Sequence, residues 1–379
     1  MRVVIAPDSF KGTIDAAGAA AALAAGWCDV RPADELICLP LADGGEGTLA
    51  VLAAADPAAG WHQAQVSGPG REQVTARWLE LPGRTHVIEL ASAAGLPQLP
   101  RPDPLYAHTA GVGELLGLAL AAGAQQIVIG LGGSASTDGG TGALAALGAR
   151  FRDSAGRDLP RGGAPLAGLA SADLSGLAPP PPGGVICLTD VRAPLLGPSG
   201  AAAVFGPQKG ADPGQVGQLE EALARLAAVL GGQPDRPGAG AAGGTGYGLA
   251  TAWGAQLLPG SAQIAEIAGL PGALAGAGLV ITGEGQYDVT SGTGKVVGAV
   301  SAAAAAAGVP AAVVAGVLAG PLQPGLREAV ELAQLAGGTA GAMAEPARWL
   351  RAAGRSLAGQ PGVIELTRDS GRPEPTAGP

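Results

Sequence analysis

Residues 127–148, IVIGLGGSASTDGGTGALAALG, join a short apolar run to an Ala/Leu-rich stretch through a cluster of glycines and hydroxyl side chains. A short β-branched apolar run predicts a buried strand, and the Ala/Leu stretch predicts a helix. The same order recurs along the chain. Strands are predicted in RVVIAPDS, ELICLPLADGG, QQIVIGLGG, GVICLTDV, GLVITGEG and PAAVVAGV, and helices over 14–26, 46–55, 111–122, 139–148, 215–230 and 295–307. This alternation predicts parallel α/β structure, in which ligands bind beyond the carboxyl ends of the strands.

Residues 61–90 depart from that alternation. They read as three alternating strands with turns at GPG and LPG, which predicts an antiparallel meander. We therefore expect two domains: a discontinuous parallel-sheet domain formed by 1–60 and 276–379, and a mixed α/β domain inserted over 61–275.

Composition excludes several classes of partner. The net charge is −9 with a pI near 4.9 and no basic run, which argues against nucleic acid and anionic membranes. Three cysteines without C-x-x-C spacing indicate reduced thiols and a cytoplasmic protein. The apolar stretch 301–320 is interrupted by Gly308 and Pro310, so it predicts no membrane span. These features leave the oligomeric state open between monomer and homodimer.

The glycine loop after the strand at 127 is a candidate anion site. Backbone N–H groups of glycines, with nearby hydroxyls, can surround an anion at a helix start. The candidate residues are Gly132, Gly133, Ser134 and Ser136. Two alternatives are a purely structural turn and a dinucleotide fingerprint, and the fingerprint would make the protein an NAD-dependent dehydrogenase built on 127–153.

Carboxylates follow three other predicted strands. Asp43 and Glu46 flank the glycines of LADGGEGTLA, where they could hold Mg²⁺ or a hydroxyl-bearing substrate, or only complement a helix dipole. Asp190 directly follows a buried-type strand, with Arg192 two residues later. A further pair, Glu284 and Asp288, lies in ITGEGQYDVTSGTGK.

The chain contains only three lysines, Lys11, Lys209 and Lys295, and each lies close to a glycine, whereas arginine supplies the other basic side chains. A lysine ammonium is a compact point charge that suits a tight phosphate or carboxylate site. We therefore predict that all three lysines hold phosphate or carboxylate oxygens in the interdomain cleft, and that Lys→Ala at each slows turnover strongly and leaves the melting temperature nearly unchanged, as surface substitutions do.

Acids, lysines and glycine loops together form the residue set of phosphoryl transfer, which depends on positioning and charge neutralisation. Asp8 and Ser9 precede Lys11 in APDSFKGT and complete the candidate set. Asp190 is the first candidate for the base or a Mg²⁺ ligand, because it comes straight off a buried-type strand, and Asp8 is the second. Asp43 is the other candidate metal ligand.

Taken in order, DSFKG, ADGGEGT, GLGGSAxxDGG, TDVxxPLxGxxGA, FGPQKGA, GAGAAGGTG and ITGEGxxD…GK closely resemble the bacterial class I glycerate kinases. The resemblance runs from Val3 to about Gly298. It implies ATP- and Mg²⁺-dependent phosphorylation of D-glycerate, with 2-phosphoglycerate favoured over 3-phosphoglycerate. It also implies two α/β domains, one flavodoxin-like and discontinuous, with the active site in the interdomain cleft.

Two positions depart from that pattern. Gln286 stands where similar proteins usually carry Arg, and Ala193 where they carry Asn. The first change removes a cation that could hold a carboxylate or phosphate. A non-catalytic nucleotide-binding protein is therefore a further alternative.

Overall fold

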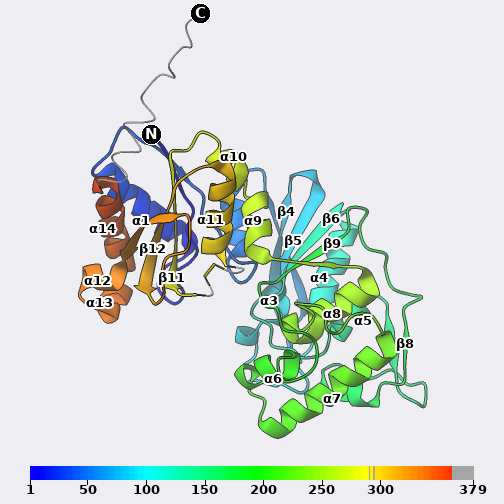
Figure 1. Cartoon of the computed structure of the whole chain (residues 1–379). Coiled ribbons are helices and arrows are strands. Elements are labelled where there is room, and N and C mark those ends of the chain that lie inside the picture. The colour runs from blue at the N-terminus through cyan, green and yellow to red at the C-terminus, as the bar shows by residue number, and fades with distance from the viewer. Residues whose placement is uncertain (290, 293–294, 361–379) are drawn as a thin grey trace, which may run out of the picture. The chain divides into compact units, whose positions relative to one another are not determined.

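The structure is a computed structural model that describes residues 1–289, 291–292 and 295–360. The chain forms two compact units, Met1–Asp43 with Ser261–Pro379, and Gly44–Gly260 (Figure 1). They are called the first and the second unit below. The domain boundaries expected near 60 and 276 stay a prediction.

The first unit contains a five-stranded parallel sheet. Its strands are β1 (Arg2–Ile5), β2 (Glu35–Cys38), β11 (Leu279–Tyr287), β12 (Ala311–Leu318) and β13 (Leu326–Glu331). They lie in the order β13-β12-β11-β1-β2, and every neighbouring pair is parallel. Counted within this unit, that is the 2-1-3-4-5 order of flavodoxin-like sheets, and the predicted class is confirmed. The order reverses between β1 and β11, the position where such sheets bind ligands.

Seven helices of the first unit are described: α1 (Ala16–Cys28), α9 (Gly260–Ile267), α10 (Leu270–Leu274), α11 (Val296–Ala307), α12 (Leu332–Ala336), α13 (Thr339–Ala344) and α14 (Pro346–Gly359). In Figure 1, α1 and α14 lie on one side of the sheet and α10 and α11 on the other. Helices α1 and α14 approach so closely that a Cβ on Gly26 would lie 1.9 Å from the Arg351 carbonyl oxygen. Their contact buries Leu23, Trp27 and Leu350 in the core.

The second unit contains a six-stranded mixed sheet. Its strands are β3 (Gly60–Ser67), β4 (Gln73–Leu81), β5 (Thr85–Glu89), β6 (Gln126–Gly130), β9 (Val185–Leu188) and β10 (Gln256–Leu258), in the order β10-β9-β6-β5-β4-β3. The pairs β3–β4 and β4–β5 are antiparallel, which confirms the predicted meander, and the remaining pairs are parallel. A separate antiparallel pair joins β7 (Arg150–Arg152) to β8 (Ser171–Asp173).

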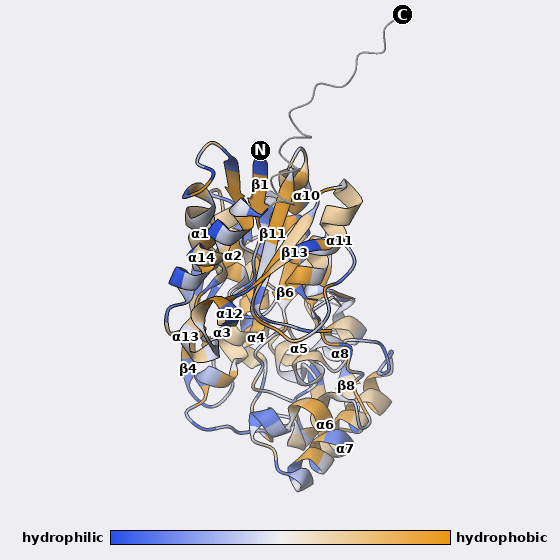
Figure 2. Ribbon diagram, turned by 60° about the vertical axis from the view of Figure 1, so that its left-hand side comes forward, coloured by the Kyte–Doolittle hydropathy of each residue, from blue (hydrophilic) through white to orange (hydrophobic). Residues whose placement is uncertain are grey.

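The α-helices described in the second unit are α2 (Thr48–Ala55), α3 (Leu90–Ala94), α4 (Ala110–Ala121), α5 (Thr141–Ala146), α6 (Ala201–Phe205), α7 (Pro213–Leu230) and α8 (Ala241–Trp253). Four 3₁₀ turns, at Pro82–Arg84, Leu96–Gln98, Ala164–Gly168 and Pro207–Lys209, complete it. Figure 2 shows apolar and polar residues alternating around α7. A capping box formed by Asp212 and Gln215 starts this helix, and Leu219 and Leu223 are buried.

In the described part of the chain, no helix combines the length and apolarity that crossing a membrane requires.

Candidate active site

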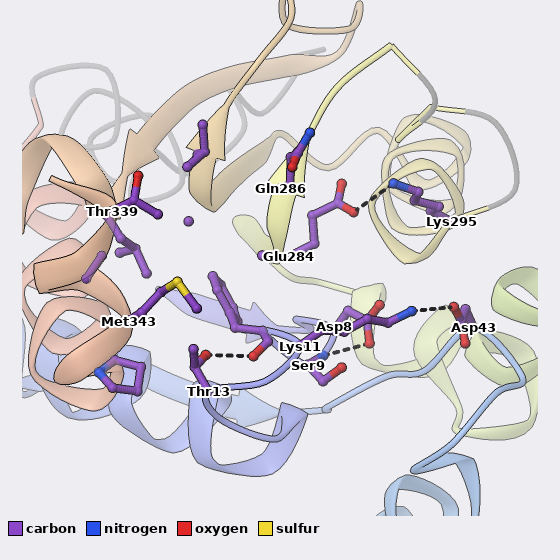
Figure 3. Close-up of a pocket in the computed structure, with 17 residues that line it drawn as sticks. Asp8, Ser9, Lys11, Thr13, Asp43, Glu284, Gln286, Lys295, Thr339 and Met343 are labelled. Carbon is purple, nitrogen blue, oxygen red and sulfur yellow. Dashed lines mark hydrogen bonds and ion pairs between the residues drawn. The ribbon is translucent and has the colours of Figure 1, made fainter. Parts of the chain in front are cut away.

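The carboxyl ends of β1 and β11 open onto a cavity of about 380 Å³ in the first unit (Figure 3). This is the position where the strand order of the sheet reverses. The cavity brings together six predicted site residues, which are Asp8, Ser9, Lys11, Asp43, Glu284 and Lys295. Gln286 also lines it.

Asp8 is held by an extension of the β1–β11 pairing. Its backbone N–H donates to the Gly283 carbonyl oxygen at 2.8 Å, and its Oδ1 accepts from the Ser9 backbone N–H at 2.6 Å. Burial raises the pKa of Asp8 from 3.8 to about 6, and the negative charge of Asp43 adds to this increase. The Ser9 hydrogen bonds and Lys11 oppose it. A carboxyl group with such a pKa can exchange a proton near neutral pH.

Lys11 extends from the same turn. Its side chain is 83% exposed, and Nζ lies 3.9 Å from Asp43 Oδ2. An exposed ion pair of this length contributes little to stability. Lys11 can therefore turn toward a bound anion at low energetic cost.

Glu284 and Lys295 form a second charged pair in the cavity. Lys295 Nζ lies 3.5 Å from Glu284 Oε2, and the Glu284 side chain is 9% exposed. Burial raises the pKa of Glu284, and the charge of Lys295 opposes that rise. Glu284 Oε1 is buried and has no hydrogen-bond partner among the residues that the structure describes. An unsatisfied buried carboxylate oxygen is costly, and a bound donor or cation would satisfy it.

The opposite part of the cavity wall is apolar. Leu332, Ala342, Met343 and Pro346, from the α12–α14 region, line it together with Thr339. Sequence reasoning missed these residues because the family resemblance ended near Gly298 and β13 was not predicted. A signal was available in PARWLRAAGRSLAG, residues 346–359, whose apolar residues recur at helical spacing.

Lys209 has a different environment, in the second unit. Only 2% of it is exposed, and its Nζ donates to the Ser136 carbonyl oxygen and to Ser134 Oγ, the latter at 3.4 Å. Burial lowers the pKa of Lys209 to about 8, and the charge of Asp138 opposes that shift. The expectation that Lys209→Ala leaves the melting temperature nearly unchanged assumed a surface position, whereas Lys209 is buried. Its predicted role in holding an anion stays a prediction.

Asp138 organises the glycine loop that carries Ser134 and Ser136. It is fully buried and accepts hydrogen bonds from the Thr109 backbone N–H and Oγ1, both at 2.8 Å, and from the backbone N–H groups of Gly140 at 3.1 Å and Gly142 at 3.2 Å. Sequence reasoning did not select Asp138, although its position between the loop and helix α5 was a signal for a capping acid.

The predicted glycines of this loop pack against neighbouring backbone. A Cβ on Gly132 would lie 2.7 Å from the Gly45 Cα, and Gly133 has a φ of 73°. Helix α5 begins only at Thr141, well after β6 ends at Gly130, whereas a dinucleotide fingerprint places the helix directly after its glycines. The anion-binding role of this loop stays a prediction.

Asp190 anchors the start of α9, because its Oδ1 accepts from the Gly260 backbone N–H at 2.8 Å. Arg192, two residues later, is exposed. Asp288 follows β11, and its backbone N–H donates to Ser291 Oγ at 2.9 Å. Asp288 is not among the residues lining the cavity. The predicted roles of these three residues stay predictions.

The start of helix α2 is supported by a residue that the sequence analysis did not select. Glu89, at the end of β5, accepts from the Leu49 backbone N–H at 2.9 Å. Burial raises the pKa of Glu89, and the N–H groups of Leu49 and Gly47 oppose that rise. Glu46, which was expected to bind substrate or complement this helix, is exposed.

The parallel sheet carries two lysines, an aspartate with a raised pKa and further carboxylates at the position where its strand order reverses. Such a site is typical of an α/β enzyme that transfers a group between anionic substrates. Comparison with known proteins makes this assignment specific. The model of the glycerate kinase family matches residues 3–360, and the chain belongs to that family. It is therefore a kinase, in agreement with the resemblance identified from the sequence, and the dehydrogenase alternative receives no support.

Individual relatives agree. The chain is 42% identical over 305 residues to glycerate 2-kinase of Escherichia coli K12, covering 78% of this chain and 80% of the relative. It is 43% identical over 306 residues to glycerate kinase of Bacillus subtilis 168, covering 78% and 79%. A crystal structure from Salmonella typhimurium LT2, provisionally named glycerate kinase 2, matches with a TM-score of 0.82 and 37% identity, covering 97% of this chain and 99% of the other.

Proposed function

We propose that the protein transfers the γ-phosphoryl group of ATP to the 2-hydroxyl of D-glycerate, producing 2-phosphoglycerate and ADP. The observation that carries the proposal is the Asp8, Lys11, Glu284 and Lys295 cluster in one cavity of a chain that belongs to this family. The relative named glycerate 2-kinase supports the choice of hydroxyl.

Asp8 is our candidate for the base. As the substrate hydroxyl oxygen bonds to the γ-phosphorus, the bond from that phosphorus to the β,γ-bridging oxygen breaks, and the hydroxyl proton passes to an Asp8 carboxylate oxygen. A pKa of about 6 leaves Asp8 mostly ionised at neutral pH and still basic enough to accept the proton. Lys11 and Lys295 supply the positive charge that stabilises the transferring group.

Magnesium fits the same cavity. Asp43 raises the pKa of Asp8, so the two carboxylates repel each other, and a divalent cation would relieve that repulsion. No group of three or more His, Cys, Asp or Glu side chains that could hold a metal occurs in the described part of the chain. This agrees with Mg²⁺, which commonly uses one or two carboxylates together with water and substrate phosphates. Asp43 would hold the ion together with water and phosphate oxygens, and the ion would neutralise phosphate charge, while Asp8 accepts the proton.

The test uses purified full-length protein with ATP, MgCl₂ and D-glycerate. Enolase, added alone, converts only 2-phosphoglycerate, and the absorbance of its product reports the reaction. We expect signal with enolase alone. When the first reaction runs in EDTA and is stopped before excess MgCl₂ and enolase are added, we expect none. Signal that requires phosphoglycerate mutase as well would identify 3-phosphoglycerate, and ADP without any phosphoglycerate would refute the proposal.

Asp190 remains the competing base. Asp190→Asn measured beside Asp8→Asn separates the two candidates, because only the loss of the base should lower kcat strongly while ATP affinity stays close to wild type.

A further inference from the structure

The cavity of the first unit has two chemically different ends. Charged side chains of Asp8, Lys11 and Lys295 lie at one end, and Leu332, Ala342 and Met343 at the other. Figure 3 shows Met343 and Thr339 on the side of the cavity opposite to Lys295. A single ligand that fills the cavity must therefore have a charged part and an apolar part.

D-glycerate does not meet this requirement by itself. It has seven non-hydrogen atoms, four of them oxygens, and occupies only roughly 100 Å³, well below the ~300–1,000 Å³ of typical ligand pockets. The cavity volume is about 380 Å³. The apolar end would stay unfilled if the acceptor alone bound here.

Two neighbouring strands of the sheet contribute glycines to the wall of this cavity. Gly285 on β11 and Gly316 on β12 both line the cavity and lie in neighbouring strands. A Cβ on Gly316 would lie 2.3 Å from the Gly285 carbonyl oxygen. No side chain projects from the strands at these two positions, so a planar ring system can contact the backbone there.

Met343 is the most exposed part of the apolar end. Its exposure is 54%, whereas Ala342 beside it is 6% exposed and Leu332 is 2% exposed. A thioether at the mouth of an apolar pocket makes favourable contacts with an aromatic ring. The Thr339 hydroxyl, on the same helix α13, can exchange hydrogen bonds with ring nitrogens.

We propose that the apolar end, formed by Leu332, Ala342, Met343 and Thr339, binds the purine base of the nucleotide, with its phosphates directed toward Lys11 and Lys295. The proposal rests on the proposed function for the identity of the nucleotide as ATP. It assigns to the α12–α13 region the recognition of a nucleobase, while the switch-point residues handle phosphate.

The experiment compares Met343→Glu with two controls. Met343→Leu keeps the apolar contact, and Leu335→Glu places the same charge on α12 at a residue that is 37% exposed and does not line the cavity. Calorimetric titration measures binding of three probes: adenosine, which has no phosphate, inorganic tripolyphosphate, which has no base, and ATP. Thermal unfolding verifies that each variant is folded.

We expect Met343→Glu to weaken adenosine and ATP binding about tenfold, because a carboxylate would be desolvated against the ring. Tripolyphosphate binding and the KM for D-glycerate should change less than about twofold, and both controls should match wild type. Adenosine affinity equal to wild type in Met343→Glu would overturn the proposal. So would an increase in the KM for D-glycerate alone, which would identify an acceptor site.

These outcomes are distinct from failure of the proposed function. A protein that binds adenosine at Met343 but does not phosphorylate D-glycerate would refute only the function. A protein that phosphorylates D-glycerate with unchanged nucleotide affinity in Met343→Glu would refute only the assignment of the base site.

Discussion

Asp8 in the first unit and Asp138 in the second are both aspartates in loops that follow parallel strands, yet their surroundings differ. Asp138 is fully buried and accepts four hydrogen bonds from Thr109, Gly140 and Gly142. Asp8 borders a cavity, its Oδ1 accepts from the Ser9 N–H, and its pKa is raised to about 6. Groups of the protein itself occupy the acceptor positions of Asp138, whereas Asp8 can still accept a hydrogen bond from a ligand.

The lysines show the same contrast. Lys209 is buried against Ser134 and Ser136, while Lys11 is exposed and only loosely paired with Asp43. A charged group whose partners are all supplied by the protein mainly supports the fold, and one at a cavity with weak partners can serve a substrate. Residue type alone does not separate these two cases.

The largest effect should come from Asp8→Asn. We expect kcat to fall by about 10²–10⁴-fold, because the amide cannot accept the hydroxyl proton. At pH 8 the melting temperature should rise, since an ionised carboxylate that burial and Asp43 destabilise is replaced by a neutral group. Steady-state kinetics and calorimetry measure both quantities. Full activity in Asp8→Asn would remove Asp8 as the base.

Asp138→Asn should instead act on stability. In the variant, an NH₂ group takes the place of Oδ2. The backbone N–H groups of Thr109 and Gly142, which donate to that oxygen, then face other donors and lose their acceptor. We expect the free energy of unfolding to fall by about 3 kcal/mol. Urea unfolding followed by circular dichroism measures this change. A variant as stable as wild type would contradict the supporting role of Asp138.

Lys209→Ala and Lys11→Ala form a matched pair. The first should lower the free energy of unfolding by about 2 kcal/mol, because it leaves a void and removes the ammonium donor of the Ser136 carbonyl oxygen. The second should leave stability unchanged and lower kcat/KM. Urea unfolding measures the stability of both variants, and steady-state kinetics on the same preparations measure their kcat/KM. Equal stability losses in both variants would eliminate the contrast between the two lysines.

The smallest effect concerns pH. The pKa of Asp8 is raised from 3.8 to about 6 in the folded protein, so its contribution to stability is fully present below about pH 3.8 and is lost as the pH rises through 6. Activity should change in the opposite direction and fall as the pH drops through about 6, because the base must be ionised. Measuring kcat/KM and the free energy of unfolding as functions of pH tests the expected direction of each change. In Asp8→Asn the stability change over this window should disappear.

The sequence predicted the parallel strands, the main helices and the meander because local periodicity and turn residues report them directly. It also selected Asp8, Lys11, Glu284 and Lys295, since glycine-flanked charges after strands are visible as motifs. It missed β13 and α12–α14, which lie beyond the motifs, although the apolar residues of α14 recur at helical spacing and would have predicted an amphipathic helix. It also missed Asp138 and Glu89. Asp138 lies before a helix, where a capping acid is expected, but its bonds to Thr109 span 29 residues and the bond of Glu89 to Leu49 spans 40, so these partners leave no local signal.

By itself, the sequence determined the α/β class, the family and the set of charged residues, because strand periodicity, glycine turns and ordered motifs are local properties. Only the tertiary structure decided which of those residues act together. The 2-1-3-4-5 strand order places the loops of β1 and β11 next to each other, although they are more than 270 residues apart in the chain. Burial lowers the pKa of Lys209 and raises that of Asp8, while Lys11 stays exposed. These differences follow from what packs around each charge and not from its neighbours in sequence.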